Sequence, residues 1–513
     1  MDENKTPAVM MRDITKRFGT TLANDKVWLD IYRGEILALL GENGSGKTTL
    51  MNMLSGIYFP DDGQIFVDGK EVLIRSPKDA FDLGIGMIHQ HFKLVDVFTA
   101  AENIVLGLNE EGRLDMKAVA ARVKKICDAY GFEVDPEQKV YDMSVSQKQT
   151  VEIVKVLYRG ADILILDEPT AVLTPQETDK LFAVLRNMRA DGKAVVIITH
   201  KMHEVEELSD RVAVLRHGQF MGDMLTKNTD AQEMTNMMVG HSVTLNIERP
   251  EPENPQPRIV VKDLTVRSVD GFLKLEDVSF TANSGEILGI AGISGCGQKE
   301  LLEAIAGLQP VEKGSIVYIH DDGSEEPLLG KDPLAIADMG VTLSFVPEDR
   351  LGMGLVGSMD LTDNMMLRSY RRGKGPFLDR TFPRRRAEWV VQELAVATPG
   401  IATPVRRLSG GNVQKVLVGR EIASAPKVLL TAYAVRGLDI GASYTIYDMI
   451  NLQKEKGVAV VYVGEDLDVL LELCDRILVL CGGKVSGIVE GRSTSKREVG
   501  LMMTQLGGEK KHE

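Results

Sequence analysis

The sequence is poor in cysteine and in aromatic residues, and it has no long hydrophobic run. Its 513 residues include four cysteines, two tryptophans and 5% aromatic residues in all. The cysteines have neither the spacing of a metal site nor that of a disulfide framework, which predicts a reduced, cytosolic chain; they are Cys127, Cys296, Cys474 and Cys481. No apolar run approaches the roughly 18 residues that indicate a membrane span, and we expect no signal peptide at the N-terminus.

An excess of positive charge is also absent. The formal net charge is −14 at pH 7, which argues against a protein that coats nucleic acid or anionic lipid. The length predicts roughly two to four domains, each large enough for its own core. We therefore expect a soluble chain, and any role at a membrane has to come through a partner.

Near its start the sequence contains a glycine-rich anion-binding loop. Gly41–Thr49 reads Gly-Glu-Asn-Gly-Ser-Gly-Lys-Thr-Thr, between the apolar run Ile36–Leu40 and a helical pattern at Leu50–Leu54. A strand, such a loop and a helix form a P-loop, which binds phosphate through backbone N–H groups and the helix N-terminus. Lys47 is expected to reach the β- and γ-phosphates of a nucleotide, and the Thr48 hydroxyl to bind Mg²⁺.

Polar residues follow two further apolar runs. Asp167 and Glu168 end the run Ile163–Leu166, where an aspartate can serve Mg²⁺ and the next glutamate can polarise an attacking water. The alternative, two acids that cap the following helix, stays open from these residues alone. His200 comes two residues after the run Ala194–Ile198 and can contact the γ-phosphate or that water; an ordinary histidine at the end of a strand is the alternative.

Gln90 is a further candidate. It follows the apolar stretch Ile85–Ile88 and could ligate Mg²⁺ and sense the γ-phosphate, although a single glutamine is more often a surface residue. The neighbouring His89 and His91 have no metal-ligand partners at useful spacing, so we interpret them as structural.

The first 245 residues alternate apolar β-branched runs with helical patterns, as in a mainly parallel α/β fold. Apolar residues between Asp115 and Tyr130 keep one helical face, which predicts an amphipathic helix. The segment 248–257 then carries four prolines and three glutamates, and we expect a stiff, solvated linker there.

A second copy follows the linker. Gly34–Gly41 recurs as Gly285–Gly292 at an offset of 251 residues, and Ser144 pairs with Ser409 at an offset of 265 residues. These two offsets account for all the matches, which indicates two similar domains. Leu408–Asn412, Leu-Ser-Gly-Gly-Asn, precedes a helical pattern up to Ile422. By itself it reads as a helix cap; beside a P-loop it becomes a second anion cradle, on the far side of a shared nucleotide.

Together these motifs resemble the ATPase subunits of ATP-binding-cassette (ABC) transporters, of the fused double-cassette type that drives simple-sugar and nucleoside import. The resemblance covers about residues 5 to 500 and implies an α/β fold with two tandem P-loop nucleotide-binding domains. Each domain should have a mainly parallel sheet, an antiparallel β subdomain and a helical subdomain. The implied boundaries are 1–245 for the first domain, 246–257 for the linker, 258–500 for the second domain and 501–513 for a polar tail.

The resemblance also implies ATP and Mg²⁺ as ligands and a role for each motif. Asp167 corresponds to Walker B, Glu168 to the catalytic base, Gln90 to the Q-loop and His200 to the switch histidine. Phe18 resembles the aromatic residue that stacks on adenine. The implied nucleotide contacts are Phe18, Gly41, Asn43, Gly44, Ser45, Gly46, Lys47, Thr48 and Thr49, and the implied metal ligands are Thr48, Gln90 and Asp167. The sequence at 346–350, Val-Pro-Glu-Asp-Arg, resembles one that marks second cassettes of this branch.

The second copy departs from the pattern at its own P-loop. Gln298 stands where Lys47 does; the other replacements are Lys299 for Thr48, Ala432 for Asp167, Tyr433 for Glu168 and Glu465 for His200. The signature motifs differ in the opposite sense, because Leu408–Asn412 is whole whereas Ser146 replaces a glycine in the first copy. The D-loop acid is likewise Thr174 in the first copy and Asp439 in the second. Cassettes of this family pair head to tail, which implies one complete site, with the first Walker motifs opposite Ser409, Gly410, Gly411 and Asp439.

The resemblance therefore predicts an ATP-hydrolysing subunit peripheral to the cytoplasmic face of the membrane, with permease subunits as partners, an external substrate-binding protein acting indirectly, and no nucleic acid. The segments 89–99 and 101–107 look closer to nucleoside importers than to ribose or galactose importers. A monosaccharide importer remains the alternative, followed by a soluble twin-cassette protein acting on ribosomes or DNA. A small-molecule kinase or GTPase is remoter, because no guanine-reading Asn-Lys-x-Asp sequence occurs. The sequence leaves open the cargo, the copies per transporter and whether the second P-loop binds nucleotide.

Overall fold

The chain forms two compact units, Met1–Thr244 and Leu245–Glu513, in the computed structural model. We describe each unit by itself. The structure describes residues 6–19, 21–90, 92–108, 115–171, 173–240, 246–268, 271–293, 295–345, 354–367, 369–370, 378–435, 438, 440–464 and 466–505. Among these residues, no helix combines the length and the hydropathy that crossing a membrane requires.

The central sheet of the first unit has six strands in the order β10-β9-β3-β8-β7-β6. All neighbours run parallel except β9 and β10. Helix α1 packs on one face and α6 on the other, which accounts for the unbroken apolar runs of β3, β7 and β8. The predicted strands at 36–40, 163–166 and 194–198 are confirmed. The strands are β3 Ile36–Leu40, β6 Ile85–Ile88, β7 Ile163–Asp167, β8 Ala194–Ile198, β9 Arg211–Arg216 and β10 Gln219–Leu225.

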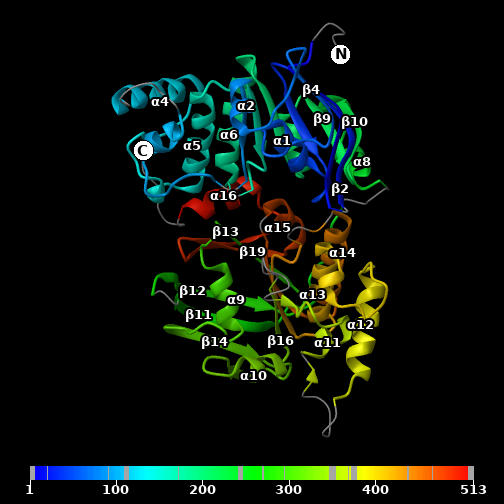
Figure 1. The fold of residues 1–513 in the computed structure, drawn as a ribbon. Helices are drawn as coiled ribbons and strands as arrows, with labels where there is room; N and C mark the ends of the chain where they lie inside the picture. Colours follow the sequence, from blue (N-terminus) through cyan, green and yellow to red (C-terminus); the bar gives the residue numbers. More distant parts are fainter. Residues whose placement is uncertain are drawn as a thin grey trace. The chain divides into compact units, whose positions relative to one another are not determined.

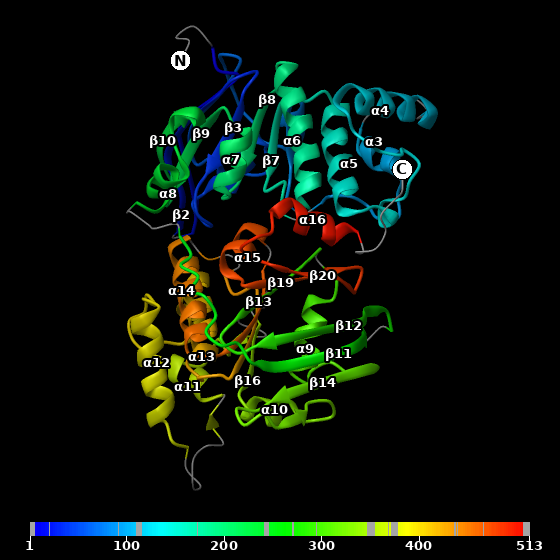
Figure 2. The same cartoon turned by 180° about the vertical axis from the view of Figure 1, so that it is seen from behind.

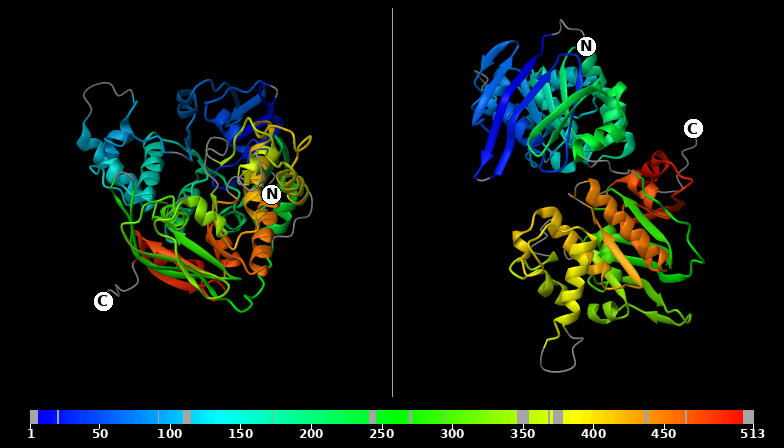
Figure 3. Two further views of the ribbon diagram at one scale, coloured as in Figure 1. Left: turned by 90° about the horizontal axis from the view of Figure 1, so that it is seen from below. Right: turned by 90° about the vertical axis from the view of Figure 1, so that its right-hand side faces the viewer.

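A second, antiparallel sheet of the first unit has the order β2-β1-β4-β5, and its long strands are seen in blue in the right panel of Figure 3. Met11, Ile14 and Val27 from this sheet share one hydrophobic cluster with Leu50 and Leu54 of α1. The P-loop helix is therefore held between the two sheets. The strands are β1 Val9–Phe18, β2 Thr21–Ile31, β4 Asp62–Val67 and β5 Lys70–Val72.

Three helices of the first unit, α3, α4 and α5, share a hydrophobic cluster, and the other side of α5 packs on the large sheet. They lie at the end of the unit away from β2 and β10 (Figures 1 and 2). The predicted amphipathic helix is confirmed as α4, and the side chain of Asp115 caps it by accepting from the backbone N–H of Lys117 at 2.9 Å. The helices of this unit are α1 Lys47–Leu54, α2 Pro77–Asp82, α3 Ala100–Val105, α4 Met116–Tyr130, α5 Val145–Tyr158, α6 Pro175–Ala190, α7 Met202–Leu208 and α8 Ala231–Val239.

The second unit repeats this plan. Its six-stranded sheet has the order β16-β17-β18-β13-β19-β20, and its antiparallel sheet has the order β12-β11-β14-β15. The predicted class, two α/β domains each with two sheets and a helical part, is confirmed. The strands are β11 Pro257–Arg267, β12 Leu273–Asn283, β13 Ile287–Gly292, β14 Lys313–Ile319, β15 Glu325–Pro327, β16 Val341–Phe345, β17 Val428–Ala432, β18 Ala459–Val463, β19 Arg476–Cys481 and β20 Lys484–Glu490.

The helices of the second unit are distributed as in the first, with α11, α12 and α13 at the end away from β11 and β12 (Figures 1 and 2). The helix predicted after Leu408–Asn412 is confirmed as α13, which begins at Gly410. The helices are α9 Gln298–Ile305, α10 Pro333–Asp338, α11 Leu361–Met366, α12 Thr381–Glu393, α13 Gly410–Ile422, α14 Ile440–Glu455, α15 Leu467–Leu473 and α16 Lys496–Thr504.

The proline-rich segment before β11 is bound to the second unit along its first half. Ile247 is buried in that unit's core, Asn451 donates its side-chain N–H to the carbonyl of Glu248 at 2.7 Å, and Arg249 donates to the carbonyl of Leu471 at 2.9 Å. The residues from 253 to 257 are exposed. The first half of the segment is therefore anchored to the second unit, although Glu248 and Glu251 are exposed there too, and the second half is solvated.

A buried arginine joins the two sheets of the first unit, because Arg211 of β9 donates to the carbonyl of Asp30 on β2 at 2.5 Å. Arg211 at the start of β9 is 2% exposed and forms ion pairs with Glu35, at 2.6 Å, and with Asp223. The corresponding Arg476 of the second unit is 23% exposed and pairs with the single carboxylate of Glu286, at 2.8 Å.

Replacing Arg211 with methionine should lower the free energy of unfolding of the first unit by about 3–5 kcal/mol, because two carboxylates would stay behind without their partner. Arg476→Met is the matched control and should cost less, since its site is wetter and holds one acid. Urea unfolding of the two variants checks the order, and equal losses would contradict it.

Candidate functional site

The loop between β3 and α1 is shaped by glycines that the structure requires. Gly44 and Gly46 have φ values of 83° and 97°, in the left-handed region that other residues avoid. A Cβ on Gly46 would lie 2.4 Å from the carbonyl oxygen of Ala23. The buried side chain of Asn24 also donates to the carbonyl of Gly46 at 3.2 Å. Strand β2 therefore fixes the start of α1, which begins at Lys47, three residues before the predicted helical pattern.

Lys47 is folded back into its own loop. Its side chain is buried, and its ammonium donates to the carbonyls of Gly41 at 2.6 Å and Glu42 at 3.0 Å. Burial lowers the pKa of Lys47, and the nearby carboxylates of Glu168, Asp167 and Glu42 oppose that effect. A cation at a helix N-terminus is well placed to bind phosphate oxygens through charge-assisted hydrogen bonds.

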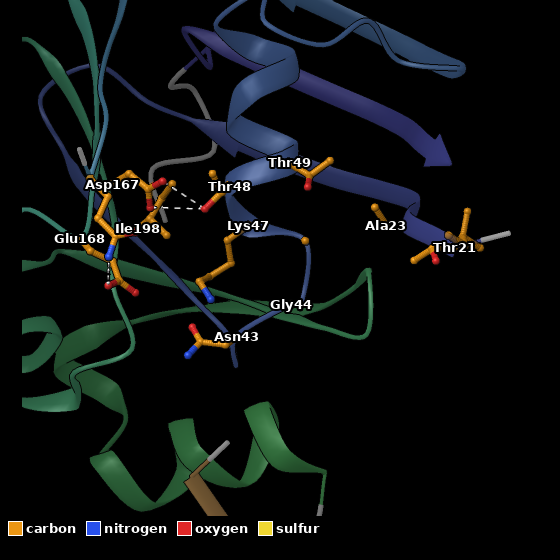
Figure 4. Close-up of a pocket in the computed structure, with 13 residues that line it drawn as sticks. Thr21, Ala23, Asn43, Gly44, Lys47, Thr48, Thr49, Asp167, Glu168 and Ile198 are labelled. Atoms are coloured by element: carbon orange, nitrogen blue, oxygen red, sulfur yellow. Dashed lines mark hydrogen bonds between the residues drawn. The ribbon is translucent and has the colours of Figure 1, made fainter. Parts of the chain in front are cut away.

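Thr48 and Asp167 form an oxygen pair at the mouth of this loop. The Thr48 hydroxyl donates to the Asp167 carboxylate at 3.1 Å, and Figure 4 shows the two side chains directed at each other. Burial raises the pKa of Asp167; the hydrogen bond from Thr48 and the charge of Lys47 lower it, and the charge of Glu168 adds to the rise. Hydroxyl and carboxylate oxygens are the ligands that Mg²⁺ prefers, so this donor set fits that ion.

Glu168 is held in place by its backbone and by two side chains. Its φ is 46°, and its N–H donates to the carbonyl of Ile198 at 2.9 Å. One carboxylate oxygen lies 2.9 Å from Nδ1 of His200, and the other accepts from Gln90 at 3.3 Å. The pKa of Glu168 is raised by burial, but the hydrogen bond and charge of His200, with the charges of Lys47 and Lys201, outweigh burial and lower it. The acid is thus kept ionised, as a general base requires.

The pocket around these groups gathers most of the predicted residues. It is lined by Thr21, Leu22, Ala23, Asn43, Gly44, Gly46, Lys47, Thr48, Thr49, Gln90, Asp167, Glu168 and Ile198. In Figure 4, Thr21 and Ala23 lie at the opposite end of the pocket from Glu168. Thr21–Ala23 and Ile198 were not found from the sequence, because each is ordinary in its local context and reaches the pocket only through the sheets. His200 contacts Glu168 without lining the pocket.

Three predicted nucleotide contacts lie outside this lining. The carbonyl of Gly41 holds Lys47. Ser45 is 4% exposed, and its hydroxyl lies beneath Gly41, where it would be 2.4 Å from a Cβ on that glycine. Phe18 is 43% exposed at the end of β1, and its ring centroid lies 5.2 Å from that of Tyr58. The interpretation of Asp167 and Glu168 as caps of the next helix is wrong, because Thr174 caps α6.

Comparisons with known proteins agree with this geometry. A family model described as ABC transporter matches residues 24–171 and 275–431. The chain belongs to the ABC transporter family.

Three relatives match almost the whole ABC chain. The identity is 42% over 501 residues with the nucleoside import ATP-binding protein NupA of Lactococcus lactis subsp. cremoris, covering 96% of this chain and 97% of that protein. It is 40% over 502 residues with the guanosine import ATP-binding protein NupO of Bacillus subtilis, with 96% and 97% covered. It is 39% over 535 residues with the glucose import ATP-binding protein TsgD13 of Haloferax volcanii, with 98% and 96% covered.

Among solved structures, RNase-L Inhibitor has a TM-score of 0.62 and 17% identity, covering 96% of this chain and 93% of that chain. At this identity it shows the fold alone. The recognition made from the motifs is confirmed by the family model and the relatives, and the chain is an ABC ATPase with two cassettes.

The second cassette keeps the P-loop backbone of the first. Gly295 and Gly297 have φ values of 87° and 97°, within a few degrees of their counterparts. Gln298 is buried, and its amide donates to the carbonyl of Gly292 at 2.8 Å, the carbonyl that corresponds to Gly41. The neutral amide thus makes the loop contact that the ammonium of Lys47 makes in the first cassette.

The second cassette lacks the side chains that correspond to Thr48, Asp167 and Glu168 of the first. Lys299 does not replace Lys47, because its ammonium pairs with Glu303 one turn further along α9, at 3.6 Å. Ala432 and Tyr433 occupy the Walker B positions, although Tyr433 keeps the left-handed backbone, with a φ of 57°. Glu465, at the place of the switch histidine, lies outside the described residues.

Both signature serines cap helices. Ser144 accepts from the N–H of Gln147 at 3.2 Å, and its hydroxyl lies 3.1 Å from that of Ser146. Ser409 accepts from the side-chain amide of Asn412 at 2.8 Å. Among the described residues, a Cβ on Gly411 would meet one atom, of Leu438, at an ordinary 3.7 Å, so these residues leave room for a side chain there. Asp439 and the segment 346–350 lie outside the described residues.

Replacing His200 with alanine should move the acid limb of the remaining turnover to higher pH. The change removes the hydrogen bond and the charge that lower the pKa of Glu168, so this pKa rises. A general base loses activity as the pH falls through its pKa, and a higher pKa places that loss at higher pH. Plots of kcat against pH for His200→Ala and for His203→Ala, an exposed control on α7, check this. An acid limb shared by both variants would contradict it.

Proposed function

We propose that the chain energises an ABC importer of nucleosides by hydrolysing MgATP at one competent site. The observation that carries the proposal is the carboxylate of Glu168, held between His200 and Gln90 across the pocket from Lys47. The second cassette has Gln298, Tyr433 and Glu465 at the positions of Lys47, Glu168 and His200. The names of two relatives, which import nucleosides or guanosine, support nucleosides as the cargo. A third relative imports glucose, and a monosaccharide importer is therefore the second candidate.

In this proposal the first cassette performs the chemistry. Lys47 leaves its loop carbonyls to bind the β- and γ-phosphates, while Glu168 orients the water for in-line attack and accepts its proton. Gln90 and His200 fix the Glu168 carboxylate in this position. Mg²⁺, held by Thr48, Asp167 and Gln90, would neutralise phosphate charge when bound. Phe18 offers an exposed ring to adenine.

The second P-loop has the neutral Gln298 where the first has the charged Lys47. This replacement is physically linked to the loss of the two Walker B acids. The buried ammonium of Lys47 faces the carboxylates of Asp167 and Glu168. A lysine at position 298 would face Ala432 and Tyr433 in place of those two carboxylates, and a buried cation that loses counter-charges is unfavourable. Gln298 keeps the loop contact without the charge. We therefore propose that the second cassette serves the first and does not hydrolyse ATP.

In this proposal the second cassette contributes its signature motif to the ATP site of the first cassette. We propose that Ser409, Gly410, Gly411 and Asp439 contact the phosphates bound at Lys47 in the ATP-bound form. Glycine within a helix costs about 1 kcal/mol relative to alanine, and the described residues leave room for a side chain at Gly411. An approaching phosphate gives a physical reason for the glycine there.

The surface beside Gln90 suits a permease. Val97, Leu106 and Tyr141 are exposed by 66%, 45% and 61%, and the N–H of Tyr141 donates to the carbonyl of Asp96 at 3.1 Å, which holds it beside Val97. Val97 and Tyr141 thus form an exposed apolar pair, and exposed apolar groups that lie together mark interaction sites. We propose that a cytoplasmic segment of a permease binds here, which places the chain at the cytoplasmic face of the membrane. An external binding protein would deliver the cargo to the permease, and no nucleic acid takes part.

Contacts within the first cassette connect this surface to the base. The N–H of Lys93 donates to Glu152 of α5 at 2.6 Å, and the N–H of Val95 donates to Asn103 of α3 at 2.7 Å. The segment after Gln90 is thus tied to the helical part, and Gln90 itself reaches Glu168. Movement of the docking surface would therefore change the position of the base.

Glu168→Gln should reduce ATP turnover by about 100-fold or more while nucleotide binding is kept, because a neutral amide cannot accept the proton. The control Gln298→Ala should leave turnover within about twofold, since only a loop contact of the second cassette is lost. Phosphate release and fluorescent-nucleotide binding measure both effects. Substantial turnover by Glu168→Gln would refute the role of the base, and loss of turnover in Gln298→Ala would make the second site catalytic.

Val97→Asp should abolish the stimulation of ATPase activity by the permease, because a charge would enter an apolar contact, and should leave the activity of the isolated chain unchanged. Leu73→Asp, another exposed residue of the first cassette, is the matched control. Co-purification with permeases from membranes, followed by ligand assays of those permeases, identifies the cargo. Normal stimulation of Val97→Asp would show that the permease binds elsewhere.

A further inference from the structure

A second polar cluster lies behind the catalytic pair in the first cassette. The hydroxyl of Thr170 donates to one carboxylate oxygen of Glu204, and the hydroxyl of Thr199 donates to the other at 3.2 Å. Thr170 and Thr199 are 4% and 3% exposed, and the side chain of Glu204 is 12% exposed. Lys201, at 3.1 Å from Glu204, supplies the opposite charge.

The cluster joins the two loops that carry the catalytic residues. Thr170 comes two residues after Glu168, and Thr199 directly precedes His200. Glu204 therefore links the end of β7 to the end of β8 from the first turn of α7. The N–H of Lys201 also donates to the hydroxyl of Thr199 at 3.1 Å, which fixes the backbone on the other side of His200. A buried carboxylate that satisfies two hydroxyls and one ammonium is a rigid connection.

The duplication of the chain provides an internal comparison. At the offset of 265 residues, the positions of Thr170, Thr199 and Glu204 are occupied by Val435, Gly464 and Val469. All three hydrogen-bonding groups are thus replaced together. Val435 and Val469 pack against the core of the second cassette instead, so this region folds without the polar cluster.

Another buried contact of the same region is kept in both copies. Gln149 of α5 donates to the carbonyl of Pro169 at 2.5 Å, and Gln414 of α13 donates to the carbonyl of Ala434 at 2.7 Å. This contact persists in the second cassette, which lacks the base and the histidine, and it therefore belongs to the fold. The cluster of Glu204 is lost exactly where Glu168 and His200 are lost, which ties it to the reaction.

We infer that Glu204 is a positioning residue of the ATPase site, which holds the loops of Glu168 and His200 at their working separation through Thr170 and Thr199. This role rests on the proposed roles of Glu168 and His200. Glu204 touches neither of these side chains directly, so its effect falls on the rate of the chemical step and leaves the phosphate contacts of Lys47 unchanged.

Glu204→Val should lower kcat by about 10- to 100-fold, as small displacements of catalytic groups do, while KM and nucleotide affinity change by less than about twofold. Glu204→Gln should retain most of kcat, because its amide can keep a hydrogen bond to each threonine. Glu207→Val is the matched control, since Glu207 lies on the same helix and pairs with the surface residue Arg186; it should be nearly wild type. A loss in Glu207→Val equal to that in Glu204→Val would overturn the inference.

A triple variant separates positioning from folding. Thr170→Val, Thr199→Gly and Glu204→Val together install the set with which the second cassette folds. We expect a melting temperature close to that of the parent chain and a kcat as low as that of Glu204→Val. Turnover at the parent rate, or a melting temperature that falls in parallel with kcat, would overturn the inference. Glu168→Gln and His200→Ala, measured beside it, report separately on the proposed function: if both keep full turnover, the proposed roles fail whatever Glu204 does.

Discussion

The buried charge of Lys47 is the constraint on which the first cassette depends. An ammonium taken out of water needs partners, and this one has the carbonyls of Gly41 and Glu42 and the nearby carboxylates of Asp167 and Glu168. The glycines shape the loop, and Asn24 holds it against β2. Because the charge balance is shared, the lysine and the two acids belong together. The second cassette supports this conclusion, because it lacks the lysine and both acids, and the neutral amide of Gln298 occupies the loop.

The two cassettes separate what the fold needs from what the reaction needs. Both keep the left-handed backbone after the Walker B strand, at Glu168 and Tyr433. Both also keep a buried glutamine on a helix that donates to the carbonyl of the residue following that position, Pro169 or Ala434. These features persist in the second cassette, which lacks the lysine and the two acids of the first, and we therefore interpret them as structural. The side chains that differ gather around one pocket. This distribution is the physical basis for assigning catalysis to the first cassette and a supporting role to the second.

Gln90 occupies the point where the pocket meets the helical part of the first cassette. Its amide reaches Glu168, and the segment that follows it is bound to α5 and α3 through Glu152 and Asn103. Helices α3, α4 and α5 share one hydrophobic cluster, and α5 also packs against the large sheet through Ile153 and Val156, so a displacement of these helices would be felt at the sheet. Such a movement would act on the base through a glutamine that also belongs to the binding pocket, which gives a direct route between a docking surface and the chemistry.

Much of this was determined by the sequence alone. Apolar runs predicted β3, β7 and β8, because strands buried on both faces need apolar side chains along their whole length. The loop Gly41–Thr49 and the acids that end β7 were recognisable because their chemistry depends on residues close together in the chain. The tertiary structure decided the rest. Thr21–Ala23 and Asn24 meet the P-loop only because β2 crosses it, and Glu204 gains its role from two threonines brought together by neighbouring strands. A local pattern cannot encode such contacts, since each residue in them is ordinary until the sheet places its partner beside it.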